Sequence, residues 1–243
     1  FETKVRHNAA MEFPVRLNKY LASEGVASRR EADALIEKGR VLVNGKRAVL
    51  GQKVNEGDAV ELTGKRPTKQ YLAYYKGRGV ITHSPAAHEI DIETKLREDY
   101  GLTGVYPVGR LDKDSEGLMI LTDDGRITGK LTDPDAGHEK EFDVPVDKEI
   151  TNQFLKRMAA GVDIEGYQTK PAQCEQRSPK RFRLILTEGK KHQIRRMCAA
   201  LGYQVQTLKR VRIMHIELGE LKPNQFRKLT KSELRVLLHA LNI

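Results

Sequence analysis

Helix caps near the start of the chain are the strongest constraint on its fold. Gly25 ends a first short helix, because glycine adopts the left-handed backbone that commonly closes a helix. Ser28 can cap a second helix, and Glu31 three residues later completes a capping box. Gly39 ends that helix. The spacing predicts two helices joined by a short turn within residues 17–39.

A hairpin signal follows the two helices. The dipeptide Asn44-Gly45 lies between apolar runs and favours a two-residue turn. The helices and the hairpin fit within residues 15–63, a unit small enough to serve as an appended binding module. Residues 1–14 lack periodicity and are predicted to be a flexible leader. Residues 64–70 carry glycine, proline and basic side chains and are predicted to be a linker.

Residues 71–243 predict an α+β domain. Strand-like apolar runs outnumber amphipathic segments and do not alternate with them regularly, which favours a mixed, mainly antiparallel sheet over a doubly wound one. Helices are expected at 92–100, 150–160, 193–201 and 232–241. Strands are expected at 105–108, 118–121, 181–186 and 213–218.

Positive charge is concentrated in two segments. The net charge is +10, and it divides into +4 over residues 1–66, −6 over 67–175 and +12 over 176–231. Two basic segments that flank an acidic one fit contacts to nucleic-acid phosphates from two sides. The charge pattern predicts a polyanionic partner.

The sequence contains no membrane or disulfide signal. No apolar run approaches the roughly 20 residues of a membrane helix, and a secretory signal is not evident, so a cytoplasmic protein is expected. Cys174 and Cys198 have no second cysteine or histidine at metal-site spacing beside them. We interpret both as reduced, structural residues.

A polar loop at residues 109–117 separates two apolar strands. It holds three carboxylates in five residues, at Asp112, Asp114 and Glu116. A charged surface turn is the simplest interpretation, but long polar connections between buried strands commonly carry functional sites. Alternation along the chain predicts that Leu111 and Asp112 point to opposite sides, one inward and one outward.

A second cluster, at residues 189–197, combines basic and apolar side chains. It lacks the glycine and Ser/Thr spacing of a phosphate-binding P-loop. A solvated basic helix start is one interpretation. On a helix that buries Ile194 and Met197, however, Arg195 lies at the edge of the apolar face and can enter a cleft. A guanidinium there suits bidentate pairing with a carboxylate.

Other chemistries have little support. His138-Glu139 begins like a metalloprotease zinc motif, but position 142 is phenylalanine rather than histidine, so no metal is expected. Ser115 lacks a histidine base in a recognisable nucleophile motif. The remaining histidines are interpreted as surface or core residues.

Three separated motifs resemble those of the RsuA-type ribosomal pseudouridine synthases. Residues 109–118 (GRLDKDSEGL) are similar to the catalytic motif, while 138–142 (HEKEF) and 193–197 (QIRRM) are similar to the other two, in order and spacing. Residues 16–62 resemble the S4 RNA-binding module that precedes the catalytic domain in these enzymes. Residues 196–214 are similar to the RluF branch, which acts on large-subunit rRNA.

The resemblance implies a fold, a reaction and a site. It implies an S4-like module followed by a synthase domain that isomerises a uridine of ribosomal RNA, in particular 23S rRNA, without cofactor or metal. Asp112 corresponds to the family's nucleophile and Arg195 to its cleft cation, and an ion pair between them is expected to keep Asp112 deprotonated. The pocket for a flipped base is expected to include Arg110, Leu111 and Leu118.

Two positions depart from the family pattern. Phe142 stands where a tyrosine usually stacks on the target base. Phenylalanine keeps the stacking, worth roughly 1–3 kcal/mol per base, and loses the hydroxyl. Residues 76–79 (KGRG) replace a common Lys-Pro-x-Gly run, which we interpret as loop variation.

Basic side chains in both positive segments are expected to bind RNA phosphates. They are Arg16, Lys19, Arg29, Arg30, Lys46, Arg47, Lys190, Lys191, Arg196, Lys209, Arg210 and Arg212. The expected partner is a structured stem-loop of ribosomal RNA. The protein is expected to bind it as a monomer, and no association with a membrane is expected.

Two alternatives compete with the enzyme. Phe142 and the basic segments are also compatible with an inactive RNA-binding factor of ribosome assembly. A DNA-binding helix-turn-helix at residues 16–39 would leave the rest of the chain unexplained. The presence of both Asp112 and Arg195 favours the enzyme, because an inactive factor need not keep them.

Overall fold

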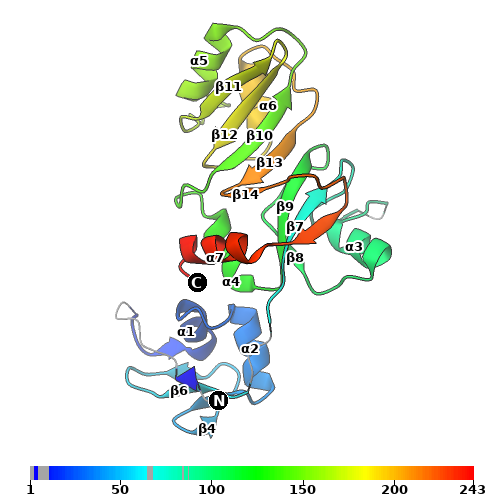
Figure 1. Cartoon of the computed structure of the whole chain (residues 1–243). Coiled ribbons are helices and arrows are strands. Elements are labelled where there is room, and N and C mark those ends of the chain that lie inside the picture. The colour runs from blue at the N-terminus through cyan, green and yellow to red at the C-terminus, as the bar shows by residue number, and fades with distance from the viewer. Residues whose placement is uncertain (1–2, 5–10, 65–67, 84, 87) are drawn as a thin grey trace. The chain divides into compact units, whose positions relative to one another are not determined.

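The structure is a computed structural model that describes residues 3–4, 11–64, 68–83, 85–86 and 88–243. Its contacts divide the chain into two compact units (Figure 1). The N-terminal unit comprises Phe1–Lys69, with Asp124–Gly129 and Ile243; the C-terminal unit comprises Gln70–Asp123 and Lys130–Asn242. Within the described residues, no helix is both long and apolar enough to span a membrane.

The N-terminal unit contains the predicted pair of helices. Helix α1 covers Leu17–Ser23 and α2 covers Arg29–Glu37. The capping box is confirmed: the Glu31 amide donates to Ser28 Oγ at 3.3 Å, and the Ser28 amide donates to Glu31 Oε2 at 2.8 Å. Two orphan amides of the helix start are thereby satisfied.

A small sheet completes this unit. Its order is β1-β6-β3-β4, from Thr3–Lys4, Val60–Leu62, Val41–Val43 and Lys46–Arg47. Strand β2 (Val15–Arg16) pairs with β5 (Lys53–Val54). The predicted hairpin turn is confirmed, since Asn44 and Gly45 have φ of 51° and 74°.

The predicted leader and linker lie partly outside the described residues. Within residues 1–14, the described Thr3–Lys4 forms strand β1, which pairs antiparallel with β6. The prediction of a flexible leader did not include this strand. Backbone pairing with Glu61 and Leu62 supplies order that local composition does not show. Residues 65–67 of the linker are outside the described part.

The described part of the C-terminal unit contains a nine-stranded mixed sheet. Its order is β11-β12-β10-β13-β9-β7-β15, and β14 and β8 pair with β13 and β9. The strands in chain order are β7 Tyr71–Lys76, β8 Tyr106–Val108, β9 Glu116–Thr122, β10 Lys140–Pro145, β11 Gln173–Ser178, β12 Arg181–Leu186, β13 Lys209–Ile213, β14 Ile216–Glu217 and β15 Phe226–Lys228. Among the described residues, these strands pair antiparallel except for β13 with β9, which confirms the predicted α+β class.

Five more helices occur in the described residues after α2, and α4 lies mostly in the N-terminal unit. They are α3 Ile92–Tyr100, α4 Gly125–Thr132, α5 Asn152–Ala160, α6 Gln193–Ala200 and α7 Lys231–Ala240. Four match predicted helices within two residues. Helix α4 was not predicted, because its two glycines weaken the local helical signal.

Helices α5 and α6 pack with β10 and β12 (Figure 1). Their shared core includes Phe154 and Met158 from α5, Ile194 and Met197 from α6, and Phe142 from β10. Burial of this apolar face holds the start of α6 in place. A second cluster packs α3 against β7 and β9 and includes Leu111 of the 109–117 loop. The 109–117 loop and the start of α6, which were predicted to carry the site, are therefore both held in place by core residues.

Candidate active site

The 109–117 loop is anchored by Leu111. This side chain is buried, its amide donates to Thr82 Oγ1 at 3.2 Å, and the Thr82 hydroxyl donates to its carbonyl oxygen at 2.8 Å. The Asp112 side chain is 37% exposed. The prediction that the side chains of Leu111 and Asp112 point to opposite sides, one inward and one outward, is confirmed. A core contact thus holds the loop while the carboxylate of Asp112 faces solvent.

Lys76, at the end of β7, supports the same loop from inside. It is fully buried, and Nζ donates to the carbonyl oxygens of Ser115 at 2.7 Å and Asp112 at 3.0 Å. Burial lowers the pKa of Lys76 to about 8, and the charge of Asp112 opposes that shift. The interpretation of residues 76–79 as loop variation missed the role of Lys76 in supporting the 109–117 loop. The available signal was a lysine that directly continues the apolar run Tyr71–Tyr75.

The expected ion pair between Arg195 and Asp112 is wrong for this conformation. Arg195 Nη2 donates instead to the carbonyl oxygen of Asp114 at 3.3 Å, and Nη1 to that of Val205 at 3.4 Å. The group beside the carboxylate is His192, whose Nε2 lies 3.5 Å from Asp112 Oδ1. The tertiary structure therefore brings the two predicted motifs together through a histidine that the sequence analysis left without a role.

The expected base pocket is only partly accessible. Arg110 is exposed, but Leu118 is fully buried inside β9 and Leu111 lies in the core. Strand pairing and packing cover both side chains in this conformation, so their role as pocket-lining residues stays a prediction. Phe142 is 8% exposed and lies opposite Leu184 on β12 and Arg210 on β13. It belongs to the core that supports α6.

Comparison with known proteins places the chain in a family. Residues 70–200 match the RNA pseudouridylate synthase family, and residues 15–60 match the S4 domain. The chain belongs to the RNA pseudouridylate synthase family. The chain is an RNA pseudouridine synthase, and it carries the S4 module predicted from its sequence.

Individual relatives agree with this assignment. The synthase is 41% identical over 226 residues to the dual-specificity RNA pseudouridine synthase RluF of Escherichia coli K12, covering 90% of the chain and 77% of that protein. It is 34% identical to the ribosomal large subunit pseudouridine synthase B of Bacillus subtilis, covering 91% and 95%. A crystal structure of a pseudouridylate synthase matches with 30% identity and a TM-score of 0.68, covering 92% of the chain and 99% of that structure. These matches support the enzyme over the inactive assembly factor.

Most of the basic residues expected to bind RNA are accessible in the synthase. Those exposed are Arg16, Lys19, Arg29, Arg30, Lys46, Arg47, Lys190 and Lys191. Lys209 and Arg196 are half-buried, and Arg196 pairs with Glu165 at 2.6 Å. The structure thus leaves exposed cations on the S4 module and on the turn before α6.

Two of the expected RNA-binding residues are engaged within the fold, so their contact with RNA stays a prediction. Arg210 is 5% exposed, and its Nε donates to the carbonyl oxygen of Leu118 at 2.7 Å, so it cannot reach a phosphate in this conformation. Arg212 pairs with Glu141 at 2.7 Å and Glu139 at 2.9 Å. The strand register places these carboxylates beside Arg212, a relationship that the local sequence does not reveal.

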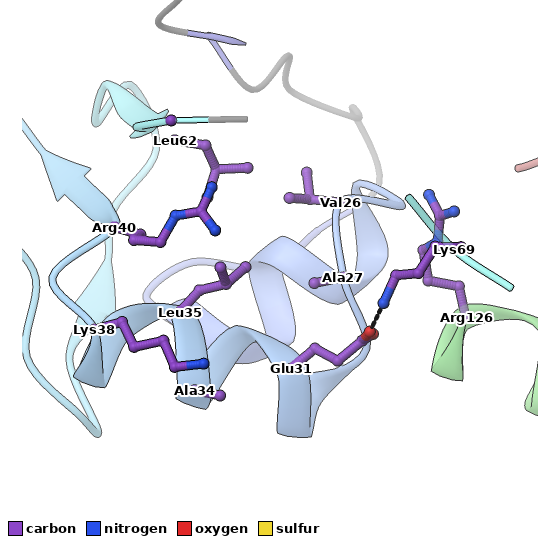
Figure 2. A pocket seen from close by; sticks show the side chains of 11 residues that line it. Val26, Ala27, Glu31, Ala34, Leu35, Lys38, Arg40, Leu62, Lys69 and Arg126 are labelled. Carbon is purple, nitrogen blue, oxygen red and sulfur yellow. Dashed lines mark hydrogen bonds and ion pairs between the residues drawn. The ribbon is translucent and has the colours of Figure 1, made fainter. Parts of the chain in front are cut away.

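A cavity of about 280 Å³ lies in the N-terminal unit (Figure 2). Val26, Leu35 and Leu62 contribute apolar surface to it. Glu31, which pairs with Lys69, is at its edge. The remaining lining residues are Ala27, Ala34, Lys38, Arg40, Gly64 and Arg126. The sequence analysis assigned none of these residues to a site.

Proposed function

We propose that this synthase isomerises a specific uridine of large-subunit ribosomal RNA and that Asp112 is its reacting carboxylate. Support for the substrate comes from the relatives, one of which is named for the ribosomal large subunit. The name of another specifies dual specificity, and a test with a second class of RNA is therefore included in the proposal.

The observation that carries the role of Asp112 is the construction of its loop. Leu111 in the core and Lys76 beneath the backbone hold the peptide, while the carboxylate is 37% exposed. A fixed backbone with an accessible reactive group is the arrangement that positions a nucleophile or base toward a bound substrate.

The reaction exchanges one glycosidic bond for another. The bond between C1′ and N1 breaks, the uracil turns, and a bond between C1′ and C5 forms. C5 loses a proton and N1 gains one, so the product is an isomer and no cofactor is consumed. A flipped uridine would present these atoms to Asp112, and Phe142 would contribute an apolar ring to the base. Attack on the sugar, attack on the ring and abstraction of a sugar proton all use the same carboxylate.

The exposed cations bind and orient the RNA in this proposal. Lys190 and Lys191 lie just before α6, close in sequence to His192, which contacts Asp112. Arg29 and Arg30 open α2 in the S4 module. Cations on each of the two units would hold phosphates of the RNA. We further propose that the synthase acts as a monomer in the cytoplasm.

The decisive experiment compares Asp112→Asn with Asp114→Asn. Each protein is incubated with rRNA or precursor particles, and pseudouridine is mapped by carbodiimide labelling and primer extension. The wild type and Asp114→Asn should modify the same uridine, whereas Asp112→Asn should modify none while binding RNA equally well. Modification by Asp112→Asn at the wild-type rate would refute the assignment.

A further inference from the structure

His192 occupies an unusual backbone position immediately before α6. Its φ is 53°, in the left-handed region that few non-glycine residues adopt, although histidine does so more often than most. Its side chain makes no capping hydrogen bond to the helix. The imidazole is therefore not explained by the local helix start, and it instead faces the loop that carries Asp112.

A buried network holds this backbone in place. Gln193, 4% exposed, donates through Nε2 to Glu188 at 2.7 Å and accepts from the Lys190 amide at 2.8 Å. Glu188 also accepts from the Tyr167 hydroxyl at 2.6 Å and the Lys170 amide at 3.0 Å. These contacts bind both ends of the turn 188–193. They stabilise the left-handed backbone of His192, which would be strained without such support.

The turn delivers the imidazole to the Asp112 carboxylate. Nε2 lies 3.5 Å from Oδ1, with the His192 side chain 50% exposed and that of Asp112 37% exposed. Within the described residues, this is the only ion pair or hydrogen bond that the carboxylate itself makes. A partner at this distance restricts the rotation of Asp112 about its side-chain bonds.

Three other groups set the charge around this pair. Lys76 of β7 acts electrostatically on Asp112 from within the fold. Arg195 of α6 contacts the Asp114 carbonyl oxygen at 3.3 Å. The carboxylate of Asp114 belongs to the same loop as Asp112 and, like it, interacts with the charge of Lys76. Lys76 and Arg195 are thus engaged with the loop backbone, which leaves the imidazole to act on the carboxylate.

We propose that His192 is a positioning residue that orients the Asp112 carboxylate for the reaction. The inference rests on the proposed role of Asp112. The protonated imidazole forms a charged pair with Asp112, and the neutral ring forms a weaker contact. A change in the protonation of the imidazole should therefore change the rate.

The test measures single-turnover rate constants from pH 5.5 to 8.5 for the wild type, His192→Ala and His192→Gln. His192→Ala should be slower by about 10- to 100-fold with RNA affinity unchanged, as expected when a reacting group loses its orientation. His192→Gln, whose amide can donate to Asp112 at every pH, should recover much of the rate and have a flatter pH profile than the wild type. His239→Ala, on the exposed side of α7, is the matched control and should keep the wild-type profile.

The outcomes separate this inference from the proposed function. If Asp112→Asn is inactive but both His192 variants keep the wild-type rate and pH profile, the positioning role is refuted and the role of Asp112 stands. If Asp112→Asn is active, the proposed function fails first. Should His192→Ala not fold, the pH profile of His192→Gln decides, and an unchanged profile overturns the inference.

Discussion

The ammonium of Lys76 donates a hydrogen bond to the carbonyl oxygen of Asp112 at 3.0 Å and thereby supports the peptide of the proposed catalytic residue. The same group donates to the Ser115 carbonyl oxygen at 2.7 Å. These contacts cross 36 and 39 residues of sequence and join the end of β7 to the 109–117 loop. The conformation of the loop therefore depends on a strand that precedes it.

Replacing Lys76 with methionine tests this support. We expect Lys76→Met to lower the free energy of unfolding by about 1–3 kcal/mol, because buried carbonyl oxygens lose their donor. The rate of pseudouridine formation should decrease as well. Lys113→Met is the matched control, since Lys113 is exposed and pairs only with Glu89 at the surface. Urea unfolding that gives equal stabilities for the two variants would contradict the prediction.

The pKa of Lys76 predicts a pH dependence of stability. Burial lowers this pKa to about 8 from an ordinary 10.5, so between these values the unfolded chain binds more protons than the folded one. The free energy of unfolding of the wild type should therefore rise, relative to Lys76→Met, as pH increases from 8 to 10. Urea denaturation at pH 7.5, 9 and 10 measures the difference. A difference that falls or stays constant would show that Lys76 titrates normally.

Phe142 should limit the rate if the missing hydroxyl takes part in the reaction. Phe142→Tyr keeps the aromatic ring and adds the hydroxyl usual at this position in the RsuA-type motif. We expect a faster single turnover with little change in RNA affinity. Phe142→Leu serves as the comparison, because it keeps an apolar side chain and removes the ring. No gain in Phe142→Tyr would show that the hydroxyl does not limit this enzyme.

Arg210 and the lysines before α6 should differ in their effect on RNA binding. Replacing both Lys190 and Lys191 with alanine should reduce the slope of log affinity against log salt by about 1–2, because two exposed phosphate contacts are removed. Arg210→Met should leave this slope unchanged, since the side chain is buried against Leu118. Filter binding across a salt series distinguishes the variants. A reduced slope in Arg210→Met would show that Arg210 does contact RNA phosphates.

Gly117 marks the parallel contact of β9 with β13. Its φ is 111°, and an added Cβ would lie 2.2 Å from the Arg210 carbonyl oxygen. We expect Gly117→Ala to lower the free energy of unfolding by about 3–5 kcal/mol, through backbone strain and overpacking. Gly129→Ala in α4 meets open space and should raise it by about 0.5–1 kcal/mol. Thermal unfolding of the two variants tests both signs.

Local signals in the sequence were sufficient for much of the secondary structure. The capping box of Ser28 and Glu31, the Asn44-Gly45 turn and the helix at Ile92–Tyr100 all occur as predicted. Each depends on residues within a few positions of one another, so the physical cause is present in the sequence itself. Helix α4 was missed because its glycines oppose the local pattern and tertiary packing outweighs them.

The sequence by itself determined the motifs, the family and the choice of Asp112 as the candidate carboxylate. Only the tertiary structure decided which side chains surround that carboxylate. It placed Lys76 under the loop, His192 beside Asp112 and Arg195 on the backbone of Asp114. The physical reason is that burial and pairing depend on neighbours brought together by the sheet, far apart in the chain. For the same reason Arg210, a basic residue in a basic segment, lies inside the fold rather than on the RNA-binding surface.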